Sequence, residues 1–546
     1  MKTYVCLWAV LCLNVCVFAA NDKVAVASGW DWSLPAGMQP VPYSGFVTWG
    51  TNRFSDKITV FGIIVPWRLV NTAPGVHDWK PVLENIQRAK SQGMRVGLHV
   101  KGVERAMVPE WVLSKYSVPI IDVRPLQENQ PWRLQVVPPW HPDVMREYAK
   151  FLEEFGKSGI PQMPEVVYGY IHGISPSRGE ELFLRPVDID EWEKTAGLTP
   201  DLLAQCLKLR LDGMLKAFRS VEHKLAWMTG GPLAAGQKGH EEYARQTDGL
   251  MEYALAHGAG WRSGGVDFQH TLFRSKPLGT SLTPDGYCVI DETLPIHAEK
   301  RFNGDENEEY GKYWEWRFGP VEKHDYRHRI STLRTLQLRQ NFQYISPATL
   351  QFNPELNEYA RLTQGRATGN SPDAWAYLRE CAIRGERGPL IVKNLERWLV
   401  QRDVEGSQSV AWQRVDRHPL GADPPGRNWD FDARRSDRKN GQDGLAFRLD
   451  PKFWPATEPA VLKVTYTDAE KTSWQVEYSG PGGGKRASAK VTGNGDGQRK
   501  TATLDLGPLS AAGAFAAGTD FRIVTLGPGD VTVTLVRILK VNWREQ

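Results

Sequence analysis

The chain has 546 residues, with 67 Lys or Arg against 63 Asp or Glu and a formal net charge of +4. A charge this close to balance lacks the clustered basic surface that is typical of nucleic-acid binders, so we expect no nucleic-acid partner. The length suits two or three domains of about 150 residues each, or fewer if one of them is a barrel.

Residues 1–19 have the pattern of a secretory signal peptide. Lys2 provides a positive start, positions 5–17 are almost wholly apolar, and Val17 and Ala19 suit a cleavage site. The apolar run is too short to span a bilayer comfortably. We therefore predict a secreted or periplasmic protein without a membrane span.

Cysteine usage beyond this segment is sparse. Only Cys206, Cys288 and Cys381 remain, and they are odd in number and widely spaced. Such a set predicts neither a disulfide framework nor a zinc site, and we expect no metal and no cofactor.

Residues 40–370 alternate short apolar runs with helical periodicity. Helical patterns occupy 79–92, 143–156, 200–220, 241–257, 327–339 and 357–364. The predicted strands are 44–49, 60–67, 95–100, 166–171, 224–228, 260–268, 297–303 and 342–350. Eight strands with helices between them predict an α/β fold, a (β/α)₈ or TIM barrel, over 20–385. A doubly wound open sheet is the alternative, but no Gly-rich phosphate turn opens the first helix.

The composition changes after residue 385. Residues 386–445 are rich in Gly, Pro, Arg, Asp and Asn, and we interpret them as a linker or long loops. From 446 to 546, β-branched runs alternate with Gly and Asp and no helical pattern intervenes. This region predicts a C-terminal β-sandwich domain.

Functional side chains of such barrels lie after the carboxyl ends of the strands. The polar and aromatic residues at these positions are Trp49, Trp67, Arg68, His99, Lys101, Arg178, Glu180, Trp227, Arg262, Glu306, Glu308 and Tyr310. The set contains carboxylates, cations and indoles. It lacks a Ser-His-Asp order and any histidine pair at metal-ligand spacing.

Two acidic stretches, 173–181 and 301–311, follow predicted strands four and seven. Glycosidic cleavage needs one carboxylic acid that protonates the leaving oxygen and one carboxylate that attacks the anomeric carbon. Glu180 is the candidate acid/base and Glu306 the candidate nucleophile. Glu308 is an alternative nucleophile, because side chains two apart in a strand point the same way.

Each stretch also has a simpler interpretation. Glu180 could cap a helix, with its charge near the positive end of the helix dipole. The run 305–309 could be a solvated acidic loop.

The stretch 65–79 (VPWRLVNTAPGVHDW) resembles the second strand and loop of clan A retaining glycoside hydrolases. The likeness is to the β-galactosidase-like families, family 42-like and including agarase- and carrageenase-type enzymes. Residues 87–98 resemble the helix and third strand that follow there, and 109–112 resemble a Pro-x-Trp segment. The resemblance implies a retaining mechanism, with Glu180 as acid/base and Glu306 as nucleophile.

Two positions depart from the family pattern. The family usually has Asn-Glu where this chain has Gly179-Glu180, and an acidic residue is common where this chain has Thr72. The C-terminal region resembles carbohydrate-binding-like β-sandwiches at 464–468, 474–478 and 520–523. Trp474 is expected in its core.

The resulting expectation is a glycoside hydrolase that cleaves a β-linked galactose-type polysaccharide or oligosaccharide. Lys101, Arg178 and Arg262 near one site would favour an anionic polysaccharide such as a sulfated algal galactan. The alternatives are an inactive polysaccharide-binding barrel and a metal-dependent hydrolase using the region of His297. The expected substrate-binding residues are Trp67, Arg68, His99, Lys101, Arg178, Trp227, Arg262, Glu308 and Tyr310.

Overall fold

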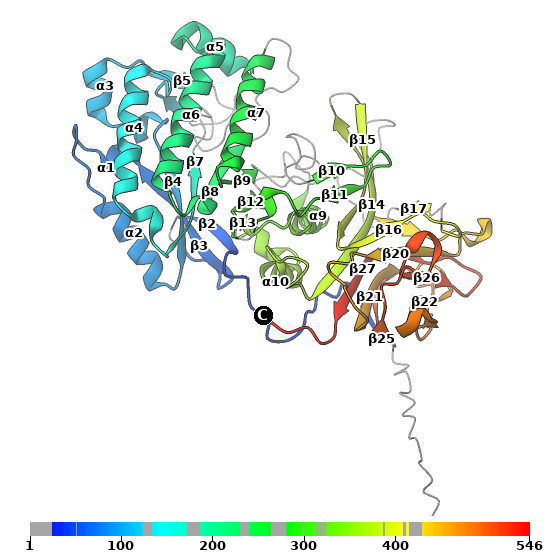
Figure 1. The fold of residues 1–546 in the computed structure, drawn as a ribbon. Helices are drawn as coiled ribbons and strands as arrows, with labels where there is room; N and C mark the ends of the chain where they lie inside the picture. Colours follow the sequence, from blue (N-terminus) through cyan, green and yellow to red (C-terminus); the bar gives the residue numbers. More distant parts are fainter. Residues whose placement is uncertain are drawn as a thin grey trace, which may run out of the picture.

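Figure 1 shows a barrel ringed by helices beside a pair of antiparallel sheets. The computed structural model describes residues 24–50, 52–123, 134–171, 186–229, 240–263, 280–298, 300–308, 310–312, 315, 320–321, 324–385, 388–407, 411–413 and 429–545.

Eight parallel strands close into the barrel, which confirms the predicted fold class. In barrel order they are β2 (Gly45–Trp49), β3 (Ile58–Pro66), β4 (Arg95–Lys101), β7 (Val166–Ile171), β8 (Leu225–Thr229), β9 (Gly260–Ser263), β12 (Asn303–Glu306) and β13 (Phe342–Tyr344). Each strand pairs in parallel with the next, and β13 pairs with β2. The carboxyl ends of all eight strands therefore meet at one end of the barrel.

Helices cover the outside of the barrel (Figure 1). They are α1 (Trp67–Val70), α2 (Lys80–Ser91), α3 (Glu110–Tyr116), α4 (Pro142–Lys157), α5 (Pro186–Ala196), α6 (Pro200–Ala217), α7 (Glu241–Ala256), α9 (His324–Gln337) and α10 (Pro354–Thr363). Helix α4 shows why they form: Tyr148, Phe151, Leu152 and Phe155 recur at helical spacing and are buried. None of the described helices combines the length and the hydropathy that a bilayer crossing requires.

The seventh strand lies later than the prediction 297–303. Residues Pro295–His297 form a 3₁₀ turn, and β12 begins only at Asn303. Its four residues, Asn-Gly-Asp-Glu, are all buried. The polar side chains are accommodated by hydrogen bonds: Asn303 donates to the carbonyl of Leu338, and Asp305 accepts from Gln340. A buried strand of this composition has no apolar run that sequence reasoning could find.

Two further sheets form the β-sandwich. The larger holds β1 (Val24–Ser28), β25 (Arg499–Leu509), β21 (Glu458–Thr467), β27 (Thr532–Lys540), β14 (Asp373–Gly385), β15 (Gly388–Arg397), β17 (Ala411–Gln413), β18 (Trp429–Phe431) and β19 (Ala433–Arg435). The smaller holds β16 (Leu399–Arg402), β20 (Gly444–Leu449), β26 (Phe521–Thr525), β22 (Ser473–Ser479), β23 (Lys485–Ala487) and β24 (Val491–Thr492). Trp474 is buried between the sheets, in the core position expected for it.

The sandwich begins earlier than predicted. Strand β14, expected within the barrel domain, pairs with β27, and the expected linker 386–445 contains β15 to β19 and the start of β20. Part of this region is polar because its buried residues are paired charges: Arg379 on β14 and Asp430 on β18 lie 2.6 Å apart with almost no exposed surface. Two short antiparallel pairs complete the described strands, β5 (Ile121–Val123) with β6 (Leu134–Val136) and β10 (Thr280–Leu282) with β11 (Cys288–Ile290).

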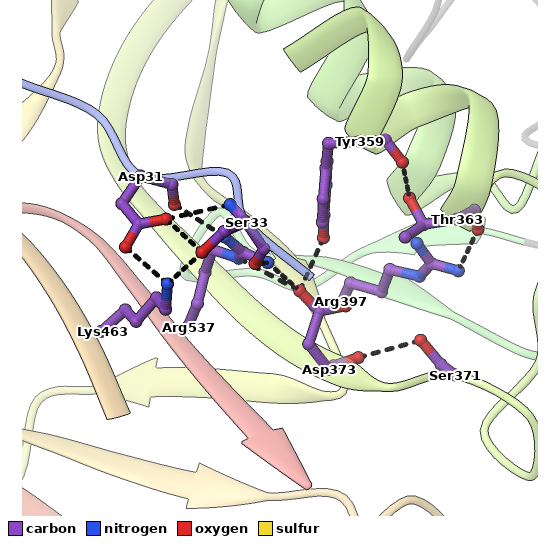
Figure 2. A network of polar contacts seen from close by, with 9 residues as sticks. All are labelled: Asp31, Ser33, Tyr359, Thr363, Ser371, Asp373, Arg397, Lys463 and Arg537. Atoms are coloured by element: carbon purple, nitrogen blue, oxygen red, sulfur yellow. Dashed lines mark hydrogen bonds and ion pairs between the residues drawn. The ribbon is translucent and has the colours of Figure 1, made fainter. Parts of the chain in front are cut away.

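A buried polar network joins the sandwich to the barrel helices (Figure 2). Asp373 of β14 accepts hydrogen bonds from the hydroxyl of Tyr359 on α10 (2.9 Å) and from Arg537 of β27 (2.8 Å). Arg537 also donates to the backbone carbonyls of Asp31 and Ser33. The segment before the first barrel strand, a barrel helix and two sandwich strands are thus tied together.

Candidate active site

Strand alternation directs one set of side chains into the barrel. Near the carboxyl end this set brings together an arginine, a glutamate, a histidine and several aromatic rings from different strands. Its members are Trp49 of β2, His99 of β4, Tyr168 and Tyr170 of β7, Arg262 of β9, Glu306 of β12 and Tyr344 of β13.

The centre of the site is an ion pair between neighbouring strands. Strand β9 pairs with β12, and this register brings Nη2 of Arg262 into direct contact with Oε1 of Glu306. Arg262 has no exposed surface, and Glu306 is 5% exposed. A guanidinium at this position favours the ionised form of a carboxyl group and holds it in place.

Aromatic rings lie beside the guanidinium of this pair. The guanidinium carbon of Arg262 lies 5.2 Å from the ring centroid of Tyr170 and 5.3 Å from that of Tyr344, within cation–π range. The ring of Trp49 lies 5.3 Å from Tyr344 and 4.1 Å from His99, and it is partly exposed. Trp49 therefore offers an accessible aromatic surface at the barrel mouth.

Three polar atoms meet below the ion pair. The hydroxyl of Tyr344 lies 2.6 Å from Nε2 of His99 and 2.5 Å from the hydroxyl of Tyr168. Gly62 of β3 leaves room for them, because a β-carbon there would lie 3.0 Å from the Tyr344 oxygen and 3.1 Å from His99 Nε2. Likewise, a β-carbon on Gly97 would overlap the ring of Tyr168. The two glycines are therefore part of the construction of the site.

His99 is uncharged at neutral pH. Burial above all, and then the neighbouring cations Arg262 and Lys101, hold the pKa of His99 well below its ordinary value. Its place in the interior and its bonds to tyrosine hydroxyls make it a positioning group below the ion pair.

Lys101 and Arg68 each have a carboxylate partner. Lys101 ends β4, is largely buried and lies 3.2 Å from Glu104. Arg68 is part-exposed on α1 and lies 3.5 Å from Glu110. Arg178 and Glu180 lie outside the described residues.

Trp67 and Trp227 were expected to bind substrate, but both are buried in the hydrophobic core around the barrel. Trp67 packs on Tyr148 and Phe151 and donates from its indole to Asn71. Trp227 pairs in register with Trp261, on the face of the sheet opposite to Arg262. A core tryptophan has no free face for a sugar, so this expectation is corrected for both residues.

Tyr310 and Glu308 follow β12. Tyr310 is buried: its hydroxyl donates to Asn307 at 2.5 Å and its ring packs against His328 and Phe352. It therefore supports the loop after β12 and does not present itself to a substrate. Glu308 is half-buried, and its backbone carbonyl accepts from Ser346.

Three tyrosines of the site were not predicted as site residues: Tyr168, Tyr170 and Tyr344. A usable signal was present in 166–171 (VVYGYI), where two tyrosines at period two share a strand face. The solvated-loop interpretation of 305–309 is wrong for its first two residues, because Asp305 and Glu306 are buried. Within the described ranges, no group of three or more His, Cys, Asp or Glu side chains could hold a metal ion.

No family model matches the sequence, and no curated protein matches it. Among solved structures, the chain is similar to the catalytic domain of a β-amylase from Paenibacillus polymyxa, with TM-score 0.35 and 10% identity, covering 59% of this chain and 98% of that one. It is similar to a β-galactosidase from the psychrophilic Marinomonas ef1, with TM-score 0.32 and 10% identity, covering 58% of each chain. A GH36 α-galactosidase from Geobacillus stearothermophilus, in complex with stachyose, gives TM-score 0.32 and 10% identity over 92% of this chain and 56% of that one.

Proposed function

We propose that the protein is a retaining glycoside hydrolase whose nucleophile is Glu306. One observation carries the proposal: the carboxylate of Glu306 ends the seventh barrel strand and contacts the guanidinium of Arg262 inside a ring of aromatic side chains. A carboxylate nucleophile must be ionised and held in a defined position, and a buried guanidinium supports both.

In the proposed reaction, Glu306 attacks the anomeric carbon while Glu180 gives its proton to the leaving oxygen. The resulting glycosyl ester on Glu306 is then hydrolysed. Glu180 takes a proton from water, whose oxygen attacks the same carbon and releases the carboxylate of Glu306. Two inversions give net retention, and the partly exposed ring of Trp49 would stack on the sugar.

The proposed substrate is a β-linked galactose-type polysaccharide or oligosaccharide, met after secretion. The proposal of a galactose-type substrate is supported by the stretch 65–79, which resembles β-galactosidase-like families. The proposal of secretion is supported by the pattern of residues 1–19. Lys101 and Arg262 each face a carboxylate of the protein. Because these charges are already paired, we favour a neutral galactan over a sulfated one.

The test is hydrolysis of a panel of neutral and sulfated galactans by the wild type and the variants Glu306→Gln, Glu180→Gln and Glu308→Gln. We expect Glu306→Gln and Glu180→Gln to lose on the order of 10³-fold or more in kcat/KM, as for groups that act in the transition state. Glu308→Gln tests the alternative nucleophile and should lose much less activity than either of them. An NMR time course should show the retained anomer first. Full activity of Glu306→Gln would contradict the proposal.

A second candidate is a polysaccharide-binding barrel without turnover. It rests on the same contact, because the carboxylate of Glu306 must leave the guanidinium of Arg262 before it can attack carbon. The same panel separates the two candidates: a galactan that binds the wild type, with no cleavage of any substrate, would establish the binding barrel.

A further inference from the structure

The sandwich domain has a cavity of its own, of about 240 Å³, on the outer face of the six-stranded sheet. Leu445, Val476 and Phe521 point into the sandwich core, so strand alternation directs their neighbours Ala446, Glu477 and Arg522 outward. These three outward residues line the cavity. All of the residues that line it belong to the sandwich domain.

The floor of the cavity crosses three strands. Arg522 of β26 is in register with Ala446 of β20 on one side and with Glu477 of β22 on the other. Nε of Arg522 donates to Glu477 at 2.8 Å, which fixes the guanidinium. Ala446 contributes only a methyl group. Its other neighbour, Arg402, is bound to Glu396 and lies over Tyr287.

Two tight turns form the walls. In one, the backbone N–H of Phe515 donates to the carbonyl of Thr519 at 3.0 Å. In the other, the N–H of Ser407 donates to the carbonyl of Val404 at 2.8 Å. A β-carbon on Gly406 would lie 3.9 Å from Nη1 of Arg522, so this turn sits beside the guanidinium. Both walls are closed by their own backbone hydrogen bonds, as in a preformed binding site.

The lining mixes polar and apolar side chains and has no net charge. Glu405 and Glu477 balance Lys485 and Arg522. Phe515 adds a partly exposed ring, with Nζ of Lys485 5.0 Å from its centroid. Ser407 also lines the cavity and is 1% exposed, and its hydroxyl has no hydrogen-bond partner in the described structure. A buried hydroxyl of this kind is normally paired, and a water or a hydroxyl of a bound molecule in the cavity can supply the partner.

We propose that this cavity binds one residue of a neutral saccharide. Fixed carboxylate and guanidinium groups can accept from and donate to adjacent sugar hydroxyls, while an aromatic edge covers the apolar face of a pyranose ring. Balanced charge favours a neutral ligand over an anion. The volume lies below the roughly 300–1,000 Å³ typical of drug-sized ligands, which suits a single ring or a chain end. The inference does not require the barrel to be catalytic.

The test uses the full chain with Glu306→Gln, so that turnover does not consume the ligand. Galactose, glucose, mannose and a galacto-oligosaccharide are titrated by calorimetry, and hydrogen exchange is followed in peptides covering 404–407 and 515–519. We expect at least one neutral sugar to bind and to slow exchange in both turns. Slowed exchange in barrel peptides alone would overturn the proposal, as would binding by sulfated sugars only or by none of the sugars.

Three variants of that chain sharpen the test. Ala446→Leu fills the floor and Phe515→Ala removes the ring, so each should weaken binding at least tenfold. Ala27→Leu makes the same change as the first on an exposed position of β1 in the larger sheet, away from the cavity. It should bind like the parent. Equal affinity in all three would overturn the proposal, and hydrolysis assays on chains with intact Glu306 report the barrel separately.

Discussion

The contact between Arg262 and Glu306 links the charge of the candidate nucleophile to a single neighbouring side chain. Removing the guanidinium leaves a buried carboxylate without its counter-charge, which favours the protonated form. For Arg262→Met we therefore expect the acid limb of the pH profile of kcat/KM to move to higher pH. Arg262→Lys keeps the positive charge but lacks the planar N–H groups of the guanidinium, so it should move the acid limb less.

The measurement is kcat/KM from pH 4 to pH 8 on the substrate found in the panel. Arg68→Met is the matched control, because it removes a part-exposed arginine paired with Glu110. The pH of its acid limb should be unchanged, even if the size of kcat/KM changes. An acid limb that stays in place in Arg262→Met would show that this contact does not control the carboxylate.

His328 on α9 makes the folded protein sensitive to acid. Burial first, and then the cations Arg329 and Arg327, lower the pKa of His328 to about 3. An unfolded histidine has a pKa of about 6.5, so the unfolded chain binds the extra proton as the pH falls. The stabilisation is therefore complete above about pH 6.5 and is lost below it, amounting to about 2 kcal/mol between pH 7 and pH 5.

Urea unfolding at pH 7 and pH 5 tests this expectation. The fall in unfolding free energy between the two pH values should be smaller by about 2 kcal/mol in His328→Gln than in the wild type. His257→Gln, which changes an exposed histidine, should match the wild type. An unchanged pH dependence in His328→Gln would contradict the assignment.

At this scale the sequence was informative about residue type and weak about contacts. Glu306 could be chosen because an acidic stretch follows the predicted seventh strand, and Arg262 because it lies in the predicted sixth strand. Their direct contact depends on the register of β9 against β12, which no local pattern encodes. Trp67 and Trp227 were misassigned because a strand-end tryptophan in sequence can face either the barrel or the helices.

Strand β3 shows how an element is shaped by a missing side chain. A methyl group at Gly62 would press on the oxygen of Tyr344 and on Nε2 of His99, both about 3 Å from its β-carbon. We expect Gly62→Ala to lower the unfolding free energy by about 1–3 kcal/mol, the usual cost of overpacking a core. It should also lower kcat/KM by displacing Tyr344 beneath Arg262.

The matched control is Gly249→Ala within helix α7, where a β-carbon would meet nothing within 4 Å. There alanine should stabilise the protein by about 1 kcal/mol through helix propensity. Thermal and urea unfolding of both variants measure the difference. An unchanged unfolding free energy in Gly62→Ala would show that the tyrosine and histidine side chains around this position can shift at little cost.

Element prediction succeeded where one face of the element is buried. Helix α2 buries Val82, Ile86 and Ala89, at the spacing read from the sequence, and its ends fall within a residue of the prediction. Strand β12 and helix α9 are different: thirteen of the fourteen residues of α9 are buried, polar ones included. Burial on all sides leaves no apolar alternation in β12, which was placed too early, and the predicted start of α9 at residue 327 is three residues late.

At the scale of the whole molecule, the bond from Tyr359 of the barrel helix α10 to Asp373, which also binds Arg537, connects barrel and sandwich (Figure 2). Burial alone would lower the pKa of Arg537, but Asp373 and Tyr359 outweigh it and keep that pKa raised. Asp373→Asn would leave a buried cation without its counter-charge, so we expect a loss of about 3–5 kcal/mol of stability. Both domains should then unfold earlier, in one transition.

Calorimetry and urea unfolding measure the size of the loss and the number of transitions. Asp212→Asn removes an exposed ion pair with Lys208 on α6, and it should cost less than about 1 kcal/mol. Two separate transitions, with only one of them shifted in Asp373→Asn, would show that the network does not couple the domains.

The sandwich could be predicted as a fold but not in its extent. Its C-terminal strands have regular β-branched alternation, whereas β1 precedes the barrel and β14 to β19 are joined by polar segments. Which strands share a sheet is decided by pairings such as β14 with β27, between residues far apart in the chain. The composition along the chain does not predict which strands pair in this way.

The pairing of β1 with β25 also limits how early the larger sheet can be completed during synthesis. Val24 lies opposite Leu504, roughly 480 positions later. At the usual 5–20 residues per second, β1 waits about 25 to 100 s for its partner to be made. During that time its backbone N–H and C=O groups remain open to strands of other chains. The larger sheet can therefore be completed only near the end of translation, after all the barrel strands have been made.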